Sequence, residues 1–292
     1  MKPSTGRDLA EMYLYPRSLA LLPSARAIRR CYRLVIQRPG AYDRWSAPIE
    51  DKLPPLVGDP VQWERHQRFA AALDMVDFER FALFGDRGLA RGITHVEGSW
   101  PDDGGFIATG VHWGTGLPAV SHMKRAGHVP AIVYRPPIEA EMAGMSLPQR
   151  RYIMRRLKLL LRVTENTAIS TGGAFERIRA QLESHRPCLV LVDSPGGPES
   201  RVVRVPTEVG VFRFRLGALE LLARLNKPYV LFRCYPDGRT GERFLTIRPP
   251  RTTDSPSEIA EDLGRFMAEA LAIDPGYWNF WRFRSALLEI PD

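Results

Sequence analysis

The stretch from residue 106 to residue 137 constrains the fold of this chain more than any other. It begins with an apolar run of strand length, residues 106–111, and ends with a second one, residues 129–134. Between them, Pro118 suits the first turn of a helix and Gly127 suits its C-terminal stop. Strand, helix and strand in this order predict a βαβ unit, so we expect an α/β fold.

The same alternation continues along the chain. Further strands are predicted near residues 93–98, 168–170 and 188–192, and an Asp-Gly turn predicts a hairpin that joins residues 229–235 to residues 243–248. Helices are predicted over residues 61–85, 145–163, 174–184, 216–226 and 257–273. We therefore expect a single α/β domain at residues 63–292, with a mostly parallel central sheet flanked by helices. Residues 1–62, rich in Pro, Arg and aromatic residues, are expected to form a helical segment packed on this body.

His112 stands where the first strand of the βαβ unit ends and its helix begins. Open α/β sheets place their ligands at this edge. The positive end of a helix dipole disfavours an imidazolium ion, so a histidine there tends to stay neutral and able to accept a proton. The position suits a general base, although a lone histidine at a strand end can also be structural. His66, His95, His122, His128 and His185 lack this context and are interpreted as structural or surface residues.

Residues 110–117 read Gly-Val-His-Trp-Gly-Thr-Gly-Leu. This segment resembles the glycerolipid acyltransferase superfamily, and most closely its lipid A late acyltransferase branch, in which a strand ends in Gly-x-His-Phe-Gly-Asn-Trp-Glu. His112, the aromatic residue after it and Gly114 match that motif. Leu117 departs from it, because the family carries there the carboxylate that orients the histidine.

Two further blocks resemble the family. Residues 133–136, Val-Tyr-Arg-Pro, match the block in which an arginine follows the next strand, and residues 191–197 match a Gly-rich loop that begins at Asp193. The resemblance implies transfer of an acyl group from the thioester of acyl carrier protein or coenzyme A to a hydroxyl or amine. It implies His112 as general base and Arg135 as the group that stabilises the oxyanion or holds the donor phosphate, with Asp193 as a third catalytic residue. The substrate-binding residues expected from it are Trp113, Gly114, Thr115 and Tyr134.

The leucine at position 117 leaves several possibilities open. Asp193 or Glu97 could orient His112 in place of the missing acid, or a backbone carbonyl could do so. The alternative is that the chain has lost acyl transfer and binds acyl carrier protein or lipid as a scaffold.

The charge of the chain favours acidic partners. Lys and Arg number 41 against 33 Asp and Glu, a net charge of +8, and only five of the cations are lysine. The helix predicted over residues 145–163 is basic and amphipathic, and we expect its Arg151 and Arg155 to contact the donor; a merely solvated polar face is the alternative. An acyl carrier protein or acyl-coenzyme A donor and an anionic membrane surface are the partners expected. No nucleic-acid motif is present, so we expect no nucleic-acid binding.

Cysteine content and hydropathy indicate in which part of the cell the chain is expected to be found. Cys31, Cys188 and Cys234 are odd in number and widely spaced, which predicts neither disulfides nor a zinc site. No run approaches 18 apolar residues, so no transmembrane helix is expected. We expect a cytoplasmic protein, peripheral at the inner face of the cell membrane, with neither metal nor cofactor. The aromatic residues at 275–283 are interpreted as either a core lid or an interfacial patch.

Overall fold

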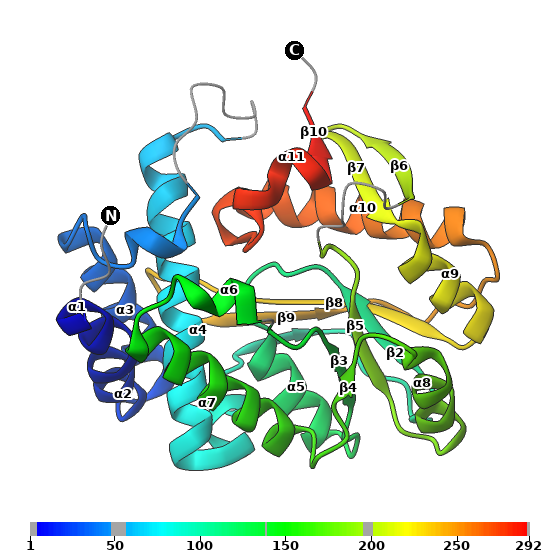
Figure 1. Ribbon diagram of the computed structural model, residues 1–292, viewed down its shortest axis with the longest axis horizontal. Helices are drawn as coiled ribbons and strands as arrows, with labels where there is room; N and C mark the ends of the chain where they lie inside the picture. Colours follow the sequence, from blue (N-terminus) through cyan, green and yellow to red (C-terminus); the bar gives the residue numbers. More distant parts are fainter. Residues whose placement is uncertain (1–4, 48–56, 138, 195–200, 291–292) are drawn as a thin grey trace.

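The structure is a computed structural model that describes residues 5–47, 57–137, 139–194 and 201–290. Within these residues, seven strands form a central sheet in the order β1-β9-β8-β2-β5-β3-β4 (Figure 1). All neighbours run parallel except β8 and β9. The strands are β1 (His95–Glu97), β2 (Ile107–Gly110), β3 (Ala131–Tyr134), β4 (Ile169–Ser170), β5 (Cys188–Leu191), β8 (Tyr229–Pro236) and β9 (Arg243–Ile247). The predicted α/β fold with a mostly parallel sheet is confirmed, as is the β8–β9 hairpin.

The βαβ unit forms as predicted, with one difference in pairing. Helix α5 (Gly116–Arg125) joins β2 to β3, and Gly127 beyond its end has a φ of 93°, which glycine adopts without strain. However, β2 and β3 are not hydrogen-bonded to each other, because β5 lies between them and pairs with both. This insertion brings the carboxyl ends of β2, β5 and β3 together at one edge of the sheet.

Helices cover both faces of the sheet. Ile107 and Val190 pack in one apolar cluster with residues of α10 (Pro256–Ile273), whereas the adjacent Ala108 and Leu189 pack on the opposite face with residues of α5 and α7 (Leu147–Val163). Figure 1 shows α10 above the sheet and α5 and α7 below it. Central strands buried on both faces are apolar at successive positions, which explains why they read as continuous hydrophobic runs.

A second, three-stranded antiparallel sheet packs against α10. Its order is β10-β7-β6, formed by β6 (Val202–Thr207), β7 (Gly210–Arg215) and β10 (Leu288–Glu289). Gly264 of α10 allows close approach, since a Cβ there would lie 2.6 Å from Val205 Cγ1. The remaining helices after β3 are α6 (Glu139–Ala143), α8 (Ala174–Glu183), α9 (Leu216–Leu225), η3 (Pro275–Tyr277), η4 (Trp281–Phe283) and α11 (Arg284–Leu287).

The N-terminal segment consists of short helices that lie against the long helix α4 (Pro60–Ala90) (Figure 1). They are α1 (Thr5–Leu9), η1 (Ala10–Leu14), α2 (Tyr15–Ala20), α3 (Ser24–Gln37) and η2 (Asp43–Trp45). Because α4 begins at Pro60, the expected division between residues 62 and 63 falls in its first turn. No helix among the described residues is long and apolar enough to cross a bilayer.

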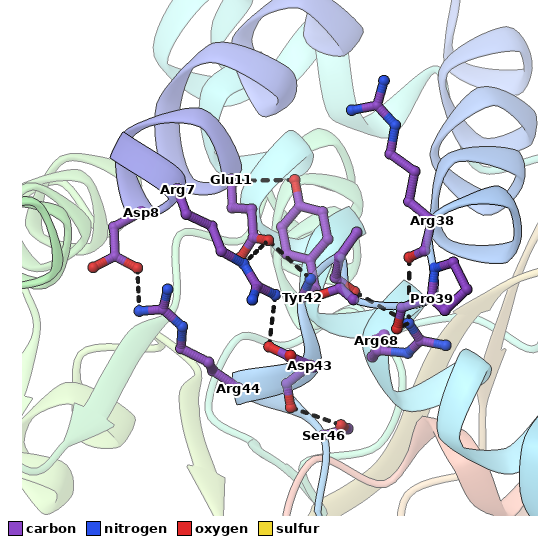
Figure 2. Close-up of polar contacts among 12 residues, drawn as sticks. Arg7, Asp8, Glu11, Arg38, Pro39, Tyr42, Asp43, Arg44, Ser46 and Arg68 are labelled. Atoms are coloured by element: carbon purple, nitrogen blue, oxygen red, sulfur yellow. Dashed lines mark hydrogen bonds and ion pairs between the residues drawn. The ribbon is translucent and has the colours of Figure 1, made fainter. Parts of the chain in front are cut away.

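Polar contacts centred on Glu11 fold the N-terminal segment onto itself (Figure 2). The Glu11 carboxylate accepts from Arg7 at 2.7 Å and from the backbone N–H of Tyr42 at 3.3 Å, and the Tyr42 hydroxyl donates to the Glu11 carbonyl at 2.9 Å. Tyr42 is fully buried at a φ of 60°, a conformation that these two bonds help to hold.

Two further contacts tie this segment to the body. The guanidinium of Arg68 on α4 donates to the backbone carbonyls of Arg38, Pro39 and Ala41. Buried Asp8 pairs with Arg44 and accepts from Ser146, the N-cap of α7, at 2.6 Å. Buried carboxylates and guanidinium groups require such partners, so these contacts hold the N-terminal helices against α4 and α7.

Candidate active site

The carboxyl ends of β2 and β5 bring His112 and Asp193 into contact. Gly110 lies opposite Leu191 in the parallel β2–β5 pair, so the residues two positions further along each chain leave the sheet side by side. His112 Nδ1 lies 2.7 Å from Asp193 Oδ1, and the backbone N–H of His112 donates to Asp193 Oδ2 at 2.8 Å. Asp193 therefore contacts His112 through both carboxylate oxygens.

Asp193 is buried and receives a third hydrogen bond. Its side chain is only 4% exposed, and the indole Nε1 of Trp278 donates to Oδ2 at 3.1 Å. The two N–H donors at Oδ2 leave Oδ1 to face His112 Nδ1. An ionised Asp193 accepts the Nδ1 proton of a neutral His112, which leaves Nε2 as the basic nitrogen. The His112 side chain is 33% exposed, so a substrate can approach it.

The turn between β2 and α5 is fixed by close contact with β8. A Cβ at Gly114 would lie 2.1 Å from the carbonyl oxygen of Cys234, and Gly114 has a φ of 73°, so a side chain is excluded there. The backbone N–H of Thr115 donates to the same carbonyl at 2.8 Å, and that of Gly114 donates to the Tyr277 carbonyl at 2.9 Å. These contacts hold His112 in a defined position.

Trp113, Gly114 and Thr115 lie in the interior. The sequence predicts that these three residues contact substrate. Trp113 is 3% exposed, its indole donates to the Asp274 carbonyl at 2.9 Å, and its ring packs against Tyr235 and Tyr277. Thr115 is also buried. Their side chains support the turn that carries His112.

Leu117 faces an apolar cluster. It is buried on α5 and belongs to the cluster below the sheet that also contains Ala108 and Phe232. Of the two carboxylates considered as substitutes for the missing acid, Asp193 contacts His112. Glu97 lies on β1, which β9 and β8 separate from β2, and its carboxylate is 3.9 Å from Arg248.

Tyr134 and Arg135 leave the sheet at the same edge as His112. They stand at and just beyond the end of β3, the neighbour of β5, with Tyr134 half-buried and Arg135 exposed. Arg215, at the start of α9, lies within electrostatic reach of Arg135: burial and the Arg135 charge together lower the pKa of Arg215. Two guanidinium groups therefore contribute positive potential to this edge.

Arg155, which the sequence predicts to contact the donor, forms an ion pair within the protein and keeps a side chain that is 33% exposed. Its guanidinium forks onto the buried carboxylate of Glu79 on α4, with Nη2 3.0 Å from Oε2. The next residue, Arg156, pairs with Asp74 and lies over the ring of Phe78. Arg151 is exposed on the same helix. Helical spacing predicted the basic residues correctly, but not which of them turn toward α4.

Trp278 and Phe280 also lie at the site, although the sequence pattern did not identify them. Besides the bond from Trp278 to Asp193, the ring of Phe280 lies 4.4 Å from the His112 imidazole, between ring centres. The signal available was the density of aromatic residues at 275–283, which did not reveal that this segment crosses the end of β2.

Other histidines and cysteines have structural surroundings. Nδ1 of His122 lies 3.1 Å from Nε1 of Trp100, and burial together with the nearby Arg125 lowers the pKa of His122. Cys31, Cys188 and Cys234 are all buried free thiols. Among the residues that the structure describes, no group of His, Cys, Asp and Glu side chains could hold a metal ion.

Two cavities lie away from His112. One, of about 450 Å³, is lined by Asp103, His185 and Lys227 among others, near the amino end of β2. The other, of about 250 Å³, is lined by residues of β8 and α10, including Tyr229 and Phe266. His112 lines neither of them, so the candidate site rests on the side-chain geometry at the carboxyl edge.

Comparisons with known proteins do not assign this chain to a family. No family model matches it, and no curated protein matches it either. Among solved structures it is similar to the 1-acyl-sn-glycerophosphate (LPA) acyltransferase PlsC from Thermotoga maritima, with 16% identity and a TM-score of 0.39 over 90% of this chain and 97% of that one. Similarity at this level does not transfer a function, so the conclusions below rest on His112 and its surroundings.

Proposed function

We propose that this chain is an acyltransferase in which His112 acts as general base. The observation that carries the proposal is the contact of His112 Nδ1 with the buried Asp193 carboxylate, which leaves Nε2 as the candidate basic nitrogen of a side chain that is 33% exposed. A histidine oriented in this way by a carboxylate is the arrangement that activates hydroxyl nucleophiles on unrelated folds. The resemblance of residues 110–117 to the glycerolipid acyltransferase motif gives the reaction class.

In the proposed reaction, the acceptor is a hydroxyl or amine of a lipid or of a secondary metabolite. Its oxygen or nitrogen attacks the carbonyl carbon of an acyl thioester, while His112 Nε2 removes the proton from the attacking atom. The new bond to the acyl carbon forms, the carbon–sulfur bond breaks, and the imidazolium returns the proton to the leaving thiolate. Arg135 is the group proposed to stabilise the oxyanion or to bind a phosphate of the donor, and Tyr134 beside it is proposed to contact the substrate.

The test is thiol release from acyl-coenzyme A and acyl carrier protein thioesters in the presence of hydroxyl and amine acceptors. Wild type should release thiol only with an acceptor present, and His112→Ala should reduce the rate by at least about 100-fold without changing the melting temperature appreciably. Activity that survives His112→Ala contradicts the proposal. Binding of acyl carrier protein without any transfer by wild type would support the alternative, an inactive scaffold.

Acyl carrier protein is the donor that the exposed charges of α7 favour. Arg151 is the better residue to change than Arg155, because Arg155 pairs with Glu79. Arg151→Glu should raise the apparent KM for an acyl carrier donor and leave that for acyl-coenzyme A unchanged, because Arg151 is exposed and a carrier protein presents an acidic surface. Arg155→Glu should instead lower the melting temperature, since it leaves two carboxylates facing each other at buried Glu79. Equal KM changes for both donors in Arg151→Glu would rule out this role.

Peripheral binding to anionic membranes is proposed for the N-terminal helices. Leu9, Leu14 and Leu21 are exposed there together with Arg17, and α3 exposes Arg26, Arg30 and Arg33 at helical spacing. The protein should sediment with vesicles that contain anionic lipid at low salt, and less at high salt, because charge attraction to the headgroups is screened. Equal binding to neutral vesicles, or no binding at low salt, would contradict this proposal.

A further inference from the structure

The C-terminal segment from Asp274 to Phe283 crosses the candidate site. The backbone N–H of Asn279 donates to the carbonyl of His112 at 2.8 Å, and its side-chain amide donates to the carbonyl of Gly114 at 3.3 Å. Trp278 forms an antiparallel bridge with Trp113. The segment is therefore bonded to the turn that carries His112.

Contacts at both ends fix this segment in place. At its start, Asp274 pairs with buried His66 of α4 and accepts at its carbonyl from the Trp113 indole. Toward its end, Trp281 packs edge-on against Trp63 at 5.4 Å, and Arg282 donates to the carbonyl of Arg44 at 2.8 Å. Anchored in this way, the residues between these ends have little freedom to move relative to His112.

Within the fixed segment, Trp278 directs its single polar atom at Asp193. The residue is 1% exposed, and its Nε1 donates to Oδ2 at 3.1 Å. The same oxygen accepts from the His112 backbone at 2.8 Å, which leaves Oδ1 for His112 Nδ1 at 2.7 Å. A carboxylate is free to rotate about its last single bond unless its oxygens are held, and the two donors to Oδ2 fix that rotation.

We propose that Trp278 is a positioning residue of the candidate site: its indole N–H holds the Asp193 carboxylate in the orientation that presents Oδ1 to His112. The effect on rate expected from this role rests on the proposed acyl transfer. The orientation of Asp193 by Trp278 does not depend on that function. The C-terminal segment is then a part of the active site. The aromatic pattern of the sequence left open whether this segment forms a core lid or an interfacial patch.

The kinetic test compares two Trp→Phe variants in the same segment. Trp278→Phe removes the donor to Asp193, whereas Trp281→Phe removes a donor to the backbone carbonyl of Pro275 and serves as the matched control. Trp278→Phe should lower kcat about 10-fold with little change in KM, since a hydrogen bond to a charged group is lost. The same change in an Asp193→Asn background should have no further effect. A full 10-fold loss in that background, or an equal loss in Trp281→Phe, would overturn the proposal.

A second measurement needs no substrate and separates this inference from the proposed function. In wild type, the indole N–H proton of Trp278 should resonate downfield in NMR because its acceptor is a carboxylate. Asp193→Asn should move this resonance upfield and leave that of Trp281 in place. A Trp278 resonance that stays unchanged would overturn the positioning role even if acyl transfer is found. The expected shift without any acyl transfer would leave the positioning role intact and contradict the proposed function.

Discussion

Asp193→Asn is expected to reduce acyl transfer by about two to four orders of magnitude. An asparagine amide keeps the shape of the side chain but has only one accepting oxygen, and the two N–H donors at the Oδ2 position require it there. The amide NH2 group then faces His112 Nδ1 and donates to it. The neutral imidazole then takes up the other tautomer, with its proton on Nε2, and Nε2 no longer serves as the base. The loss should therefore be in kcat, measured as thiol release at saturating donor and acceptor.

The double variant with His112→Ala tests whether the two residues act as one unit. Since Asp193 is proposed to act through His112, the double variant should be no slower than His112→Ala alone. A matched control is Asp103→Asn, which alters another His–Asp contact of 2.7 Å, the exposed pair of Asp103 with His185. Full activity in Asp193→Asn, or multiplicative losses in the double variant, would show that Asp193 does not orient His112.

Leu117→Glu is expected to destabilise the protein by roughly 2–5 kcal/mol, although it introduces the acid of the acyltransferase motif that residues 110–117 resemble. The reason is the position of Leu117 in the apolar cluster on the α5 face, where a carboxyl group would be buried without a partner in that cluster. Burial would raise the pKa of the new carboxyl above its unfolded value. The destabilisation should therefore be smaller at about pH 5 than at about pH 8. At the higher pH the carboxyl group ionises freely in the unfolded chain, whereas in the folded protein its ionisation is opposed by burial.

Thermal melts at the two pH values measure this effect. Leu117→Met is the control, because a volume-conserving apolar change costs less than about 1.5 kcal/mol and adds no titrating group. Leu117→Glu could instead melt like wild type at about pH 8, or gain transfer activity. Either result would contradict the prediction and mean that the new side chain reaches His112 instead of the core.

The fold was predictable from local pattern because its central strands are buried on both faces. The apolar runs at residues 106–111 and 188–192 follow directly from that burial, and His112 could be placed at a strand end from the same pattern. What the pattern does not contain is the order of strands. Only the insertion of β5 between β2 and β3 makes Asp193 the neighbour of His112, while Glu97 is carried away on β1.

The remaining parts of the site depend on side-chain direction and on contacts between distant segments. Trp113 follows His112 directly, yet it turns into the interior, because the chain bends at His112, where the Trp113 N–H donates to the Val111 carbonyl at 2.7 Å. Trp278 lies 85 residues from Asp193, and no local periodicity links the two. Arg155 and Arg151 belong to one basic helix, but only the packing of α7 on α4 decides that Arg155 meets Glu79.

The tautomer of His112 in the wild-type protein tests the central claim most directly, because every proposed role of Asp193 acts through it. Nitrogen-15 NMR of the labelled histidine rings at about pH 8.5, where imidazole is ordinarily neutral, distinguishes a protonated Nδ1 from a protonated Nε2. We expect His112 to carry its proton on Nδ1 in wild type and mainly on Nε2 in Asp193→Asn. A wild-type His112 protonated on Nε2 would contradict the assignment of His112 as a general base oriented by Asp193.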